Sequence, residues 1–212
     1  MLLKNYYYYY PSSLPLKFCN DILELAKNKK SQEAITGQQD LDNESDKEHL
    51  EKSRKKRKSN ITWLDERWIY KEIHPYIHEA NKEAGWNFQW DFSENAQFTE
   101  YGSNQHYNWH ADSWEEPYNF PDNLDKHGKI RKLSVTLSLS EPFTYEGGNL
   151  EFDFRNSADL DWTKKETQRT ITEIRPKGSI CIFPSFLWHR VTPVTKGVRH
   201  SLVLWNLGFP YK

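Results

Sequence analysis

Two histidines and one aspartate have the side-chain types and the spacing to hold a single divalent metal ion. His110 and Asp112 flank one residue in the segment YGSNQHYNWHADSW. On an extended strand, residues i and i+2 project to the same side, about 6.6 Å apart along the chain, so this imidazole and carboxylate can converge. His189 follows the strand-like run SICIF and a Pro-containing turn, which places it to supply a third ligand. Two imidazoles and one carboxylate on one face suit Fe(II) and leave coordination positions open.

A basic residue and a hydroxyl follow the second histidine on a predicted strand. Arg199 lies ten residues after His189, and Ser201 lies two residues beyond Arg199. Because side chains alternate along a strand, Arg199 and Ser201 project to the same face. A guanidinium pairs bidentately with a carboxylate and stays charged at every relevant pH. Taken alone, Arg199 indicates a surface salt bridge, but its position after a candidate ligand in an apolar strand favours a carboxylate clamp.

The elements that must position these residues are strands preceded by helices. Three-four spacing of apolar residues predicts helices over Phe18–Asn28 and Asp65–Ala84. After Gly85, short β-branched and aromatic runs alternate with turn residues. They predict strands at Phe88–Phe92, Ala96–Tyr101, Leu133–Leu139, Asn149–Phe154, Thr170–Ile174, Ser179–Phe183 and Val198–Leu204. This order predicts a single domain of mainly β structure with flanking helices (α+β), a sandwich or jelly roll with helices along one flank.

The second predicted helix contains a proline between two histidines. Pro75 is expected to kink or divide the helix. His74 and His78 are four residues apart, a spacing that can hold zinc, but Pro75 disturbs that geometry. We therefore expect both histidines to face solvent.

Three other segments have unusual composition. Residues 38–60 pass from acidic to basic and are expected to form a charged, mobile insert, since no aromatic residue interrupts the basic run to stack on bases. The Tyr6–Tyr10 run, followed by Pro11, is typical of a short aromatic strand and then a turn, although an arm that packs on a partner is an alternative. The long connection Ser113–Lys129, with Trp114, Tyr118 and Phe120, is a candidate lid.

Composition excludes several classes of protein. The 212 residues carry 29 basic and 30 acidic side chains, so no bulk attraction to nucleic acid or to a membrane surface is expected. Two cysteines cannot build a disulfide framework, which favours a reducing compartment. No signal peptide or membrane-spanning run is visible, and a cytoplasmic location is expected.

The stretch from about Ala96 to Trp205 resembles the Fe(II)/2-oxoglutarate-dependent oxygenases, specifically the prolyl 4-hydroxylase-like branch. The matching segments are YGSNQHYNWHAD, RKLSVTLSLSEPFTYEGGNLEF and RPKGSICIFPSFLWHRVTPVTKGVRHSLVLW. Upstream, SNITWL resembles the helical flank of the same branch more weakly. The resemblance implies a double-stranded β-helix (jelly-roll) core over residues 96–212, with the N-terminal helices of residues 1–95 packed on one sheet.

The resemblance also implies an activity and a role for particular residues. It implies a dioxygenase that uses Fe(II), 2-oxoglutarate and O2, with ascorbate as reductant, and that hydroxylates a prolyl residue in a peptide or protein with release of succinate and CO2. The implied metal ligands are His110, Asp112 and His189; the implied cosubstrate contacts are Arg199, Ser201 and Tyr101; and the implied substrate contacts are Arg131, Tyr107 and Trp205.

The sequence departs from the family pattern at two positions and leaves alternatives open. Ser138 stands where the oxygen-sensing prolyl hydroxylases have a cosubstrate-binding Tyr, and Arg199 stands where the collagen-type enzymes have Lys. A zinc-dependent hydrolase with the same three ligands and a non-catalytic jelly-roll binding module remain alternatives. Free amino acids and other small molecules are also possible substrates, and the sequence leaves the regiochemistry and the oligomeric state open.

Overall fold

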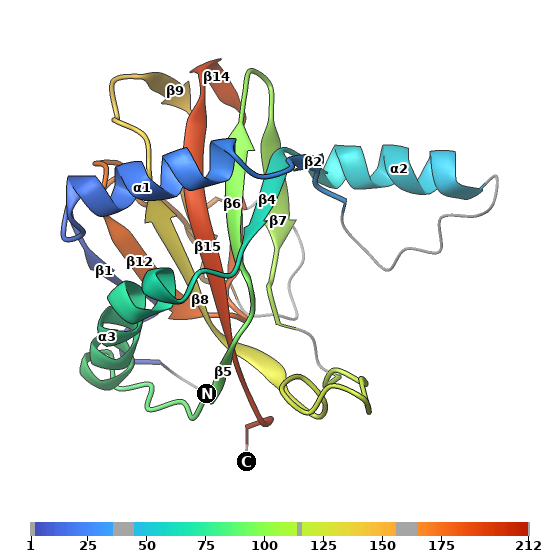
Figure 1. The fold of residues 1–212 in the computed structure, drawn as a ribbon, viewed down its shortest axis with the longest axis vertical. Coiled ribbons are helices and arrows are strands. Elements are labelled where there is room, and N and C mark those ends of the chain that lie inside the picture. The colour runs from blue at the N-terminus through green and yellow to red at the C-terminus, as the bar shows by residue number, and fades with distance from the viewer. Residues whose placement is uncertain (1–2, 36–44, 114–115, 156–164, 212) are drawn as a thin grey trace.

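A computed structural model of the protein describes residues 3–35, 45–113, 116–155 and 165–211, with side chains from residue 51 in the second of these ranges. Within these ranges the strands pair antiparallel and form two main sheets and a two-stranded ribbon. Figure 1 shows two helices lying across one face of the larger sheet. The arrangement is the double-stranded β-helix with N-terminal helices on one sheet that the sequence predicts.

The strands of the described residues fall into three groups. The larger sheet has the order β1-β12-β8-β15-β6-β4-β2, with β5 paired to β15; the smaller has the order β11-β10-β13-β7-β3; and β14 pairs with β9. The strands are β1 (Tyr8–Tyr10), β2 (Gln32–Glu33), β3 (Arg57–Lys58), β4 (Asn60–Leu64), β5 (Phe92–Ser93), β6 (Ala96–Tyr101), β7 (His106–His110), β8 (Ile130–Ser138), β9 (Tyr145–Gly147), β10 (Leu150–Asp153), β11 (Gln168–Thr170), β12 (Ile180–Pro184), β13 (Trp188–Val191), β14 (Val194–Gly197) and β15 (Arg199–Gly208).

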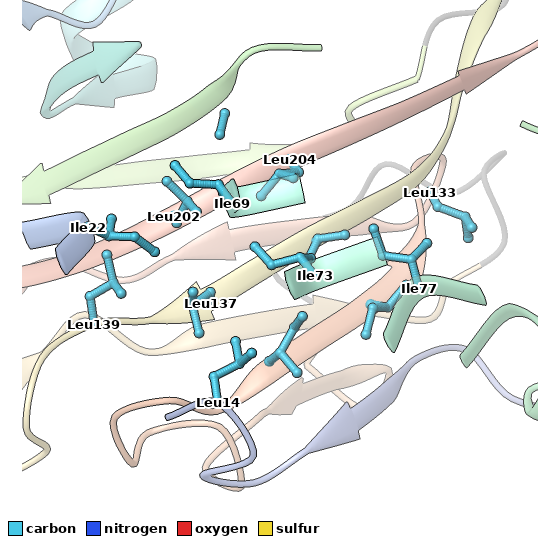
Figure 2. Close-up of a cluster of buried hydrophobic side chains, with 14 of the residues drawn as sticks. Leu14, Ile22, Ile69, Ile73, Ile77, Leu133, Leu137, Leu139, Leu202 and Leu204 are labelled. Carbon is cyan, nitrogen blue, oxygen red and sulfur yellow. The ribbon is translucent and has the colours of Figure 1, made fainter. Parts of the chain in front are cut away.

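The main core lies between the helices and the larger sheet. α1 (Leu16–Lys27) buries Phe18, Cys19, Ile22 and Ala26, and α3 (Arg67–Glu83) buries a row of isoleucines. Figure 2 shows Ile22 of α1 and the isoleucines of α3 among leucines of β8 and β15, such as Leu137 and Leu202. Each fully buried aliphatic side chain contributes about 1.5–3 kcal/mol relative to exposure, so this layer fixes the sheet against the helices. The two predicted helices are confirmed.

Pro75 does not divide the second helix. The structure has one continuous helix, α3, with Pro75 inside it and exposed. Ile69, Ile73 and Ile77 lie on the opposite face and are fully buried. Because packing of this row stabilises the helix on both sides of the proline, the helix continues through it despite the lost hydrogen bond.

The tyrosine run forms the edge of the larger sheet. β1 pairs with β12, with Tyr8 opposite Ile182 and Tyr10 opposite Ile180. Tyr7 lies against Phe152 at a ring-centroid distance of 5.3 Å, which adds an aromatic contact to the second core cluster. The last three tyrosines of the run therefore form a strand, as the sequence predicts, and Tyr6 and Tyr7 precede it.

The second half of the charged segment forms regular secondary structure, and most of the described side chains of its helix are exposed to solvent. Residues 45–56 form α2 (Ser45–Lys56), and the chain then enters β3 and β4; residues 38–44 lie outside the described residues. Arg57, the fourth residue of the run RKKRK, is only 6% exposed and pairs opposite Tyr107. SNITWL, which the sequence assigns to the helical flank, is strand β4 at the side of β6. Tertiary pairing decides both, since nothing local in a charged run signals burial.

The predicted strand over Phe88–Phe92 is wrong except at its last residue. β5 begins at Phe92, and the preceding residues follow the helix in an irregular path. Their backbone groups bond elsewhere: the Phe88 N–H donates to Asn81 Oδ1 at 3.0 Å, and the Asp91 N–H donates to the Leu207 carbonyl at 2.9 Å. Ala96–Tyr101 is confirmed by β6 with the same bounds.

Among the described residues, every helix is too short or too polar to cross a lipid bilayer.

Candidate metal centre

The three predicted ligands converge at the end of the smaller sheet. His110 ends β7 and lies opposite His189 of β13, and Asp112 follows in the next loop. The Nε2 atoms of His110 and His189 lie 3.6 Å and 3.5 Å from the two oxygens of Asp112. One ligand atom from each side chain falls within 4.8 Å of the others, and all three residues are buried. The geometry is that of a site for one metal ion.

Hydrogen bonds to the other ring nitrogens orient both imidazoles. His110 Nδ1 lies 2.7 Å from the Asn108 carbonyl, and His189 Nδ1 lies 2.9 Å from the Leu187 carbonyl. A carbonyl can only accept, so each Nδ1 carries the proton and each Nε2 presents its lone pair to the site. Asp112 Oδ2 in turn accepts a hydrogen bond from Ser134 Oγ at 2.7 Å, which fixes the carboxylate.

Protonation states in the site suit metal binding. Burial, and then His189, hold the pKa of His110 well below its ordinary value, so this imidazole is neutral. Burial by itself would raise the pKa of Asp112, but the nearby His189, His110 and Arg131 lower it below its ordinary value. Imidazole nitrogens and an ionised carboxylate are the donor set that Fe(II) takes in a facial triad. The residues present therefore fit Fe(II).

A bulge in β7 brings Tyr107 to the same cavity as His110. In a regular strand, residues three apart would face opposite sides. The pairing of β7 with β13 shifts between His189 and Val191, so Tyr107 and His110 both face inward. Their rings stack at a centroid distance of 3.5 Å.

Arg199 reaches the same cavity from the larger sheet. It begins β15, is 4% exposed, and lies opposite Tyr101 of β6. Its Nη1 donates to Ser201 Oγ at 3.2 Å, and its guanidinium lies 5.5 Å from the Tyr101 ring centroid. Within the described residues no carboxylate is within ion-pair distance of Arg199. A buried guanidinium without an acid partner is ready to bind an anionic ligand.

Side chains alternate along β15, so that one face of the strand lines the metal cavity and the other face lies in the core, as the sequence predicts. Arg199 and Ser201 line the cavity between the sheets, together with Trp205. Leu202 and Leu204 point the other way into the core under the helices (Figure 2). Ser138, opposite Ser201, donates instead to the Ile174 carbonyl at 2.5 Å.

The residues predicted to contact substrate occupy two layers. Tyr107 and Trp205 line the cavity directly. Arg131 stacks on the Trp205 ring at 3.9 Å and pairs with Glu94 at 2.6 Å. Trp205 Nε1 is buried and has no hydrogen-bond partner among the described residues, so it is a donor available to a ligand. Arg131 therefore positions Trp205, and a direct contact between Arg131 and substrate stays a prediction.

Sequence reasoning missed a second arginine in the cavity. Arg57 lines the cavity, donates to Ser59 Oγ at 2.9 Å and lies 4.6 Å from the Tyr107 ring centroid. Gln97 Oε1, also in the cavity, accepts a weaker hydrogen bond from Arg57 at 3.4 Å. In the structure, strand alternation places Arg57, Ser59 and Ile61 on the buried face and Lys58 on the exposed face, but the charged run itself carries no local sequence signal of that burial.

The structure describes Ser113 and residues 116–129 of the candidate lid Ser113–Lys129. Over residues 116–129, the Tyr118 N–H donates to the Lys129 carbonyl at 2.9 Å, and the Tyr118 and Phe120 rings lie 5.6 Å apart. Trp114 lies outside the described residues.

The fold and the site together define a jelly-roll protein with a mononuclear centre of two histidines and one carboxylate. The family model for the 2OG-Fe(II) oxygenase superfamily matches residues 96–206, slightly more than half of the chain. The chain therefore belongs to the 2OG-Fe(II) oxygenase superfamily, as its sequence motifs predict, and Fe(II), 2-oxoglutarate and O2 are the cofactor and cosubstrates that this family implies.

Curated relatives match the same half of the chain. A PKHD-type hydroxylase from Pseudoalteromonas atlantica is 35% identical over 110 residues, which are 51% of this chain and 40% of that protein. One from Synechococcus sp. strain CC9902 is 39% identical over 100 residues, 47% of this chain and 35% of that protein. The chain thus spans roughly two-fifths or less of these relatives.

Solved structures share the fold over nearly the whole chain. The viral collagen prolyl hydroxylase of Paramecium Bursaria Chlorella virus-1 superposes with a TM-score of 0.61 at 18% identity, covering 97% of both chains. A Pseudomonas putida prolyl-4-hydroxylase gives 0.62 at 16% identity, covering 96% of this chain and 93% of that one. A Trichoplax adhaerens prolyl hydroxylase, solved with a hypoxia-inducible-factor peptide, gives 0.59 at 16% identity, covering 96% and 84%.

Proposed function

We propose that this protein is an Fe(II)- and 2-oxoglutarate-dependent dioxygenase that hydroxylates an unactivated C–H bond of a prolyl residue in a peptide or protein. One observation carries the proposal: Arg199, a buried guanidinium with no acid partner among the described residues, lines the same cavity as His110, Asp112 and His189.

Each side chain of the site has a part in this reaction. His110, Asp112 and His189 would hold Fe(II), and Arg199 with Ser201 and Tyr101 would hold the distal carboxylate of 2-oxoglutarate. The bound metal, 2-oxoglutarate and O2 supply the oxidising chemistry and release succinate and CO2, with ascorbate as a reductant. The protein fixes the cosubstrate and excludes water from a cavity closed between two sheets.

Two further hydrogen-bond donors in the cavity support a peptide substrate. Trp205 Nε1 lacks an acceptor, and the guanidinium of Arg57 bonds only to the neutral side chains of Ser59 and Gln97 among the described residues. Peptide carbonyls can satisfy such donors, and the Tyr107 ring offers an apolar face to a pyrrolidine ring. A neighbouring fold, the Trichoplax adhaerens prolyl hydroxylase, was solved with a peptide fragment.

Arg199 also distinguishes the proposed dioxygenase from a zinc hydrolase, and turnover distinguishes it from a binding module. A zinc hydrolase with the same ligands needs one activated water and no clamp for a second anion. A binding module without turnover would bind metal and 2-oxoglutarate but would form no succinate.

Turnover assays test the proposal. We expect the protein with Fe(II), 2-oxoglutarate, O2 and ascorbate to form succinate, faster with proline-containing peptides, and intact mass should show the addition of one oxygen atom. Replacing proline by alanine in an active peptide should abolish the added mass. A rate equal to that of His189→Ala with every peptide, or the same rate with Zn²⁺, would contradict it.

We further infer that residues 1–212 act as one domain, with 96–212 as the catalytic core. The support is that α1 and α3 pack on the sheet that carries Arg199.

A further inference from the structure

A second cavity lies at the end of the larger sheet where β15 terminates. It has a volume of about 520 Å³ and lies between the segment after α3, the last residues of β15 and the start of β8. In the described part of the chain it shares no lining residue with the metal cavity. A volume in this range accommodates a small organic molecule.

One wall of this second cavity carries a buried lysine without an acid partner. Lys132 is 3% exposed, and within the described residues no carboxylate lies within ion-pair distance of its ammonium. The neighbouring bases are paired: Lys129 lies 2.7 Å from Asp91, and Arg131 lies 2.6 Å from Glu94. The Lys132 ammonium instead lies 3.4 Å from the centroid of the Tyr211 ring.

A buried ammonium without a counter-charge is unfavourable in the free protein. Burial alone lowers the pKa of Lys132, with no carboxylate to offset it. An aromatic face offsets only part of the lost hydration. An anion that enters the cavity would supply the missing partner.

The rest of the lining is largely aromatic. Phe88, Trp90, Phe209 and Tyr211 line the cavity, and the rings of Phe88 and Tyr211 lie 5.0 Å apart. Flat apolar walls favour a ligand with a ring. Asp91, also in the lining, disfavours a ligand with several negative charges, so a single carboxylate matches the single free ammonium.

We propose that this cavity binds a small aromatic monocarboxylate, with the carboxylate paired to Lys132 and the ring against Phe88, Trp90 and Tyr211. The inference is independent of the proposed activity, because it concerns other residues and is read out by binding.

Calorimetric titration tests the site directly. The metal-loaded protein is first saturated with 2-oxoglutarate without O2, so that the metal cavity is filled, and is then titrated with 3-phenylpropionate or its neutral amide. We expect one-to-one binding of the carboxylate, at least tenfold tighter than the amide. Equal affinities for the two probes, or no saturable binding of the carboxylate, would overturn the proposal.

Variants of Lys132 assign the affinity to this residue. Lys132→Met should weaken 3-phenylpropionate at least tenfold and leave the amide unchanged, whereas Lys132→Arg should keep the preference for the carboxylate. Lys82→Met, which removes a side chain that is 82% exposed, is the matched control and should bind like the parent protein.

Thermal unfolding separates a ligand site from a structural role. Methionine has a similar length and no charge to bury, so Lys132→Met should unfold at the same temperature as the parent protein or higher. If Lys132 instead stabilises the fold through its contact with Tyr211, the variant will unfold at a lower temperature or fail to fold. Either of those results would assign Lys132 to the core and refute the site.

Discussion

Burying an arginine side chain costs free energy unless an anion compensates its charge. This cost favours binding of an anionic ligand at Arg199. The side chain is 4% exposed and donates to a neutral hydroxyl of Ser201. Most buried charges in proteins are paired, because desolvation of an ion costs several kcal/mol. A guanidinium held in this state is pre-organised for a carboxylate ligand, since among the described residues it has no ion-pair partner to give up.

Removing the guanidinium should therefore weaken 2-oxoglutarate binding and spare the metal. We expect Arg199→Met to lose about 2 kcal/mol or more of binding free energy, about 30-fold in affinity, because one partner of a buried ion pair is lost. Titration of the metal-loaded variant with 2-oxoglutarate measures this. Arg169→Met, on an exposed side chain, is the control, and an unchanged affinity in Arg199→Met would rule out the clamp.

His74 shows how burial of one residue makes stability depend on pH. The sequence interpretation that His74 faces solvent is wrong, because the ring is half-buried against Trp90 at 5.2 Å. Burial, and then His78, lower its pKa from the ordinary 6.5. As the pH falls below 6.5, His74 takes up a proton in the unfolded chain but stays neutral in the folded chain. The free energy of unfolding therefore falls as the pH falls.

Substituting His74 should flatten this pH dependence. Between about pH 7 and pH 5, the parent protein should lose more stability than His74→Gln, in which Gln can keep the hydrogen bond to Ser93. Denaturant unfolding at the two pH values measures the difference. The exposed His127→Gln serves as control, and parallel curves for His74→Gln and the parent would refute the assignment.

At the scale of elements, the Gly147-Gly148 turn determines whether Arg199 can enter the cavity. Gly148 has a φ of +57°, and a Cβ there would lie 2.9 Å from Arg199 Cδ and 2.9 Å from Val194 Cγ2. The turn between β9 and β10 therefore needs glycine for its backbone angle and for the space beside the arginine.

A matched pair of glycine substitutions separates these two requirements. Gly148→Ala and Gly85→Ala should each lose about 1 kcal/mol of stability from a positive φ. Only Gly148→Ala should also weaken 2-oxoglutarate binding, because nothing lies within 4 Å of a Cβ at Gly85. Thermal unfolding and titration with 2-oxoglutarate measure the two effects. A similar loss of affinity in both variants would contradict this account of the turn.

At the scale of the whole molecule, the metal ligands tie separate parts of the smaller sheet together. His110 ends β7, His189 lies on β13, and the Asp112 N–H donates to the carbonyl of Ser185 after β12 at 2.8 Å. A bound ion crosslinks these segments only in the folded chain. Binding is thereby linked to folding.

Metal removal should consequently lower the unfolding temperature. With metal at about 100 times its dissociation constant, the folded state gains about 2.7 kcal/mol, which corresponds to about 5–10 °C for a chain of this size. Calorimetry with and without a chelator measures the shift. His110→Ala should show no such shift, and an equal response in that variant would place the metal elsewhere.

The sequence alone determined the parts of this protein that depend on local pattern. The spacing of apolar residues located the helices α1 and α3. Strand alternation placed Arg199 and Ser201 on one face, and the His-x-Asp motif identified two of the metal ligands. These features follow from a period of 3.6 or 2 residues, which can be read without knowing what packs against the element.

Only the tertiary structure decided which residues share the cavity. Arg57 is buried because β3 pairs with β7, and Tyr107 joins His110 because a bulge shifts one register. In the second cavity, Lys132 has no acid partner among the described residues because its neighbours Lys129 and Arg131 hold Asp91 and Glu94. Each of these depends on contacts between segments far apart in the chain, and the energy of a buried charge is set by those contacts rather than by its sequence neighbours.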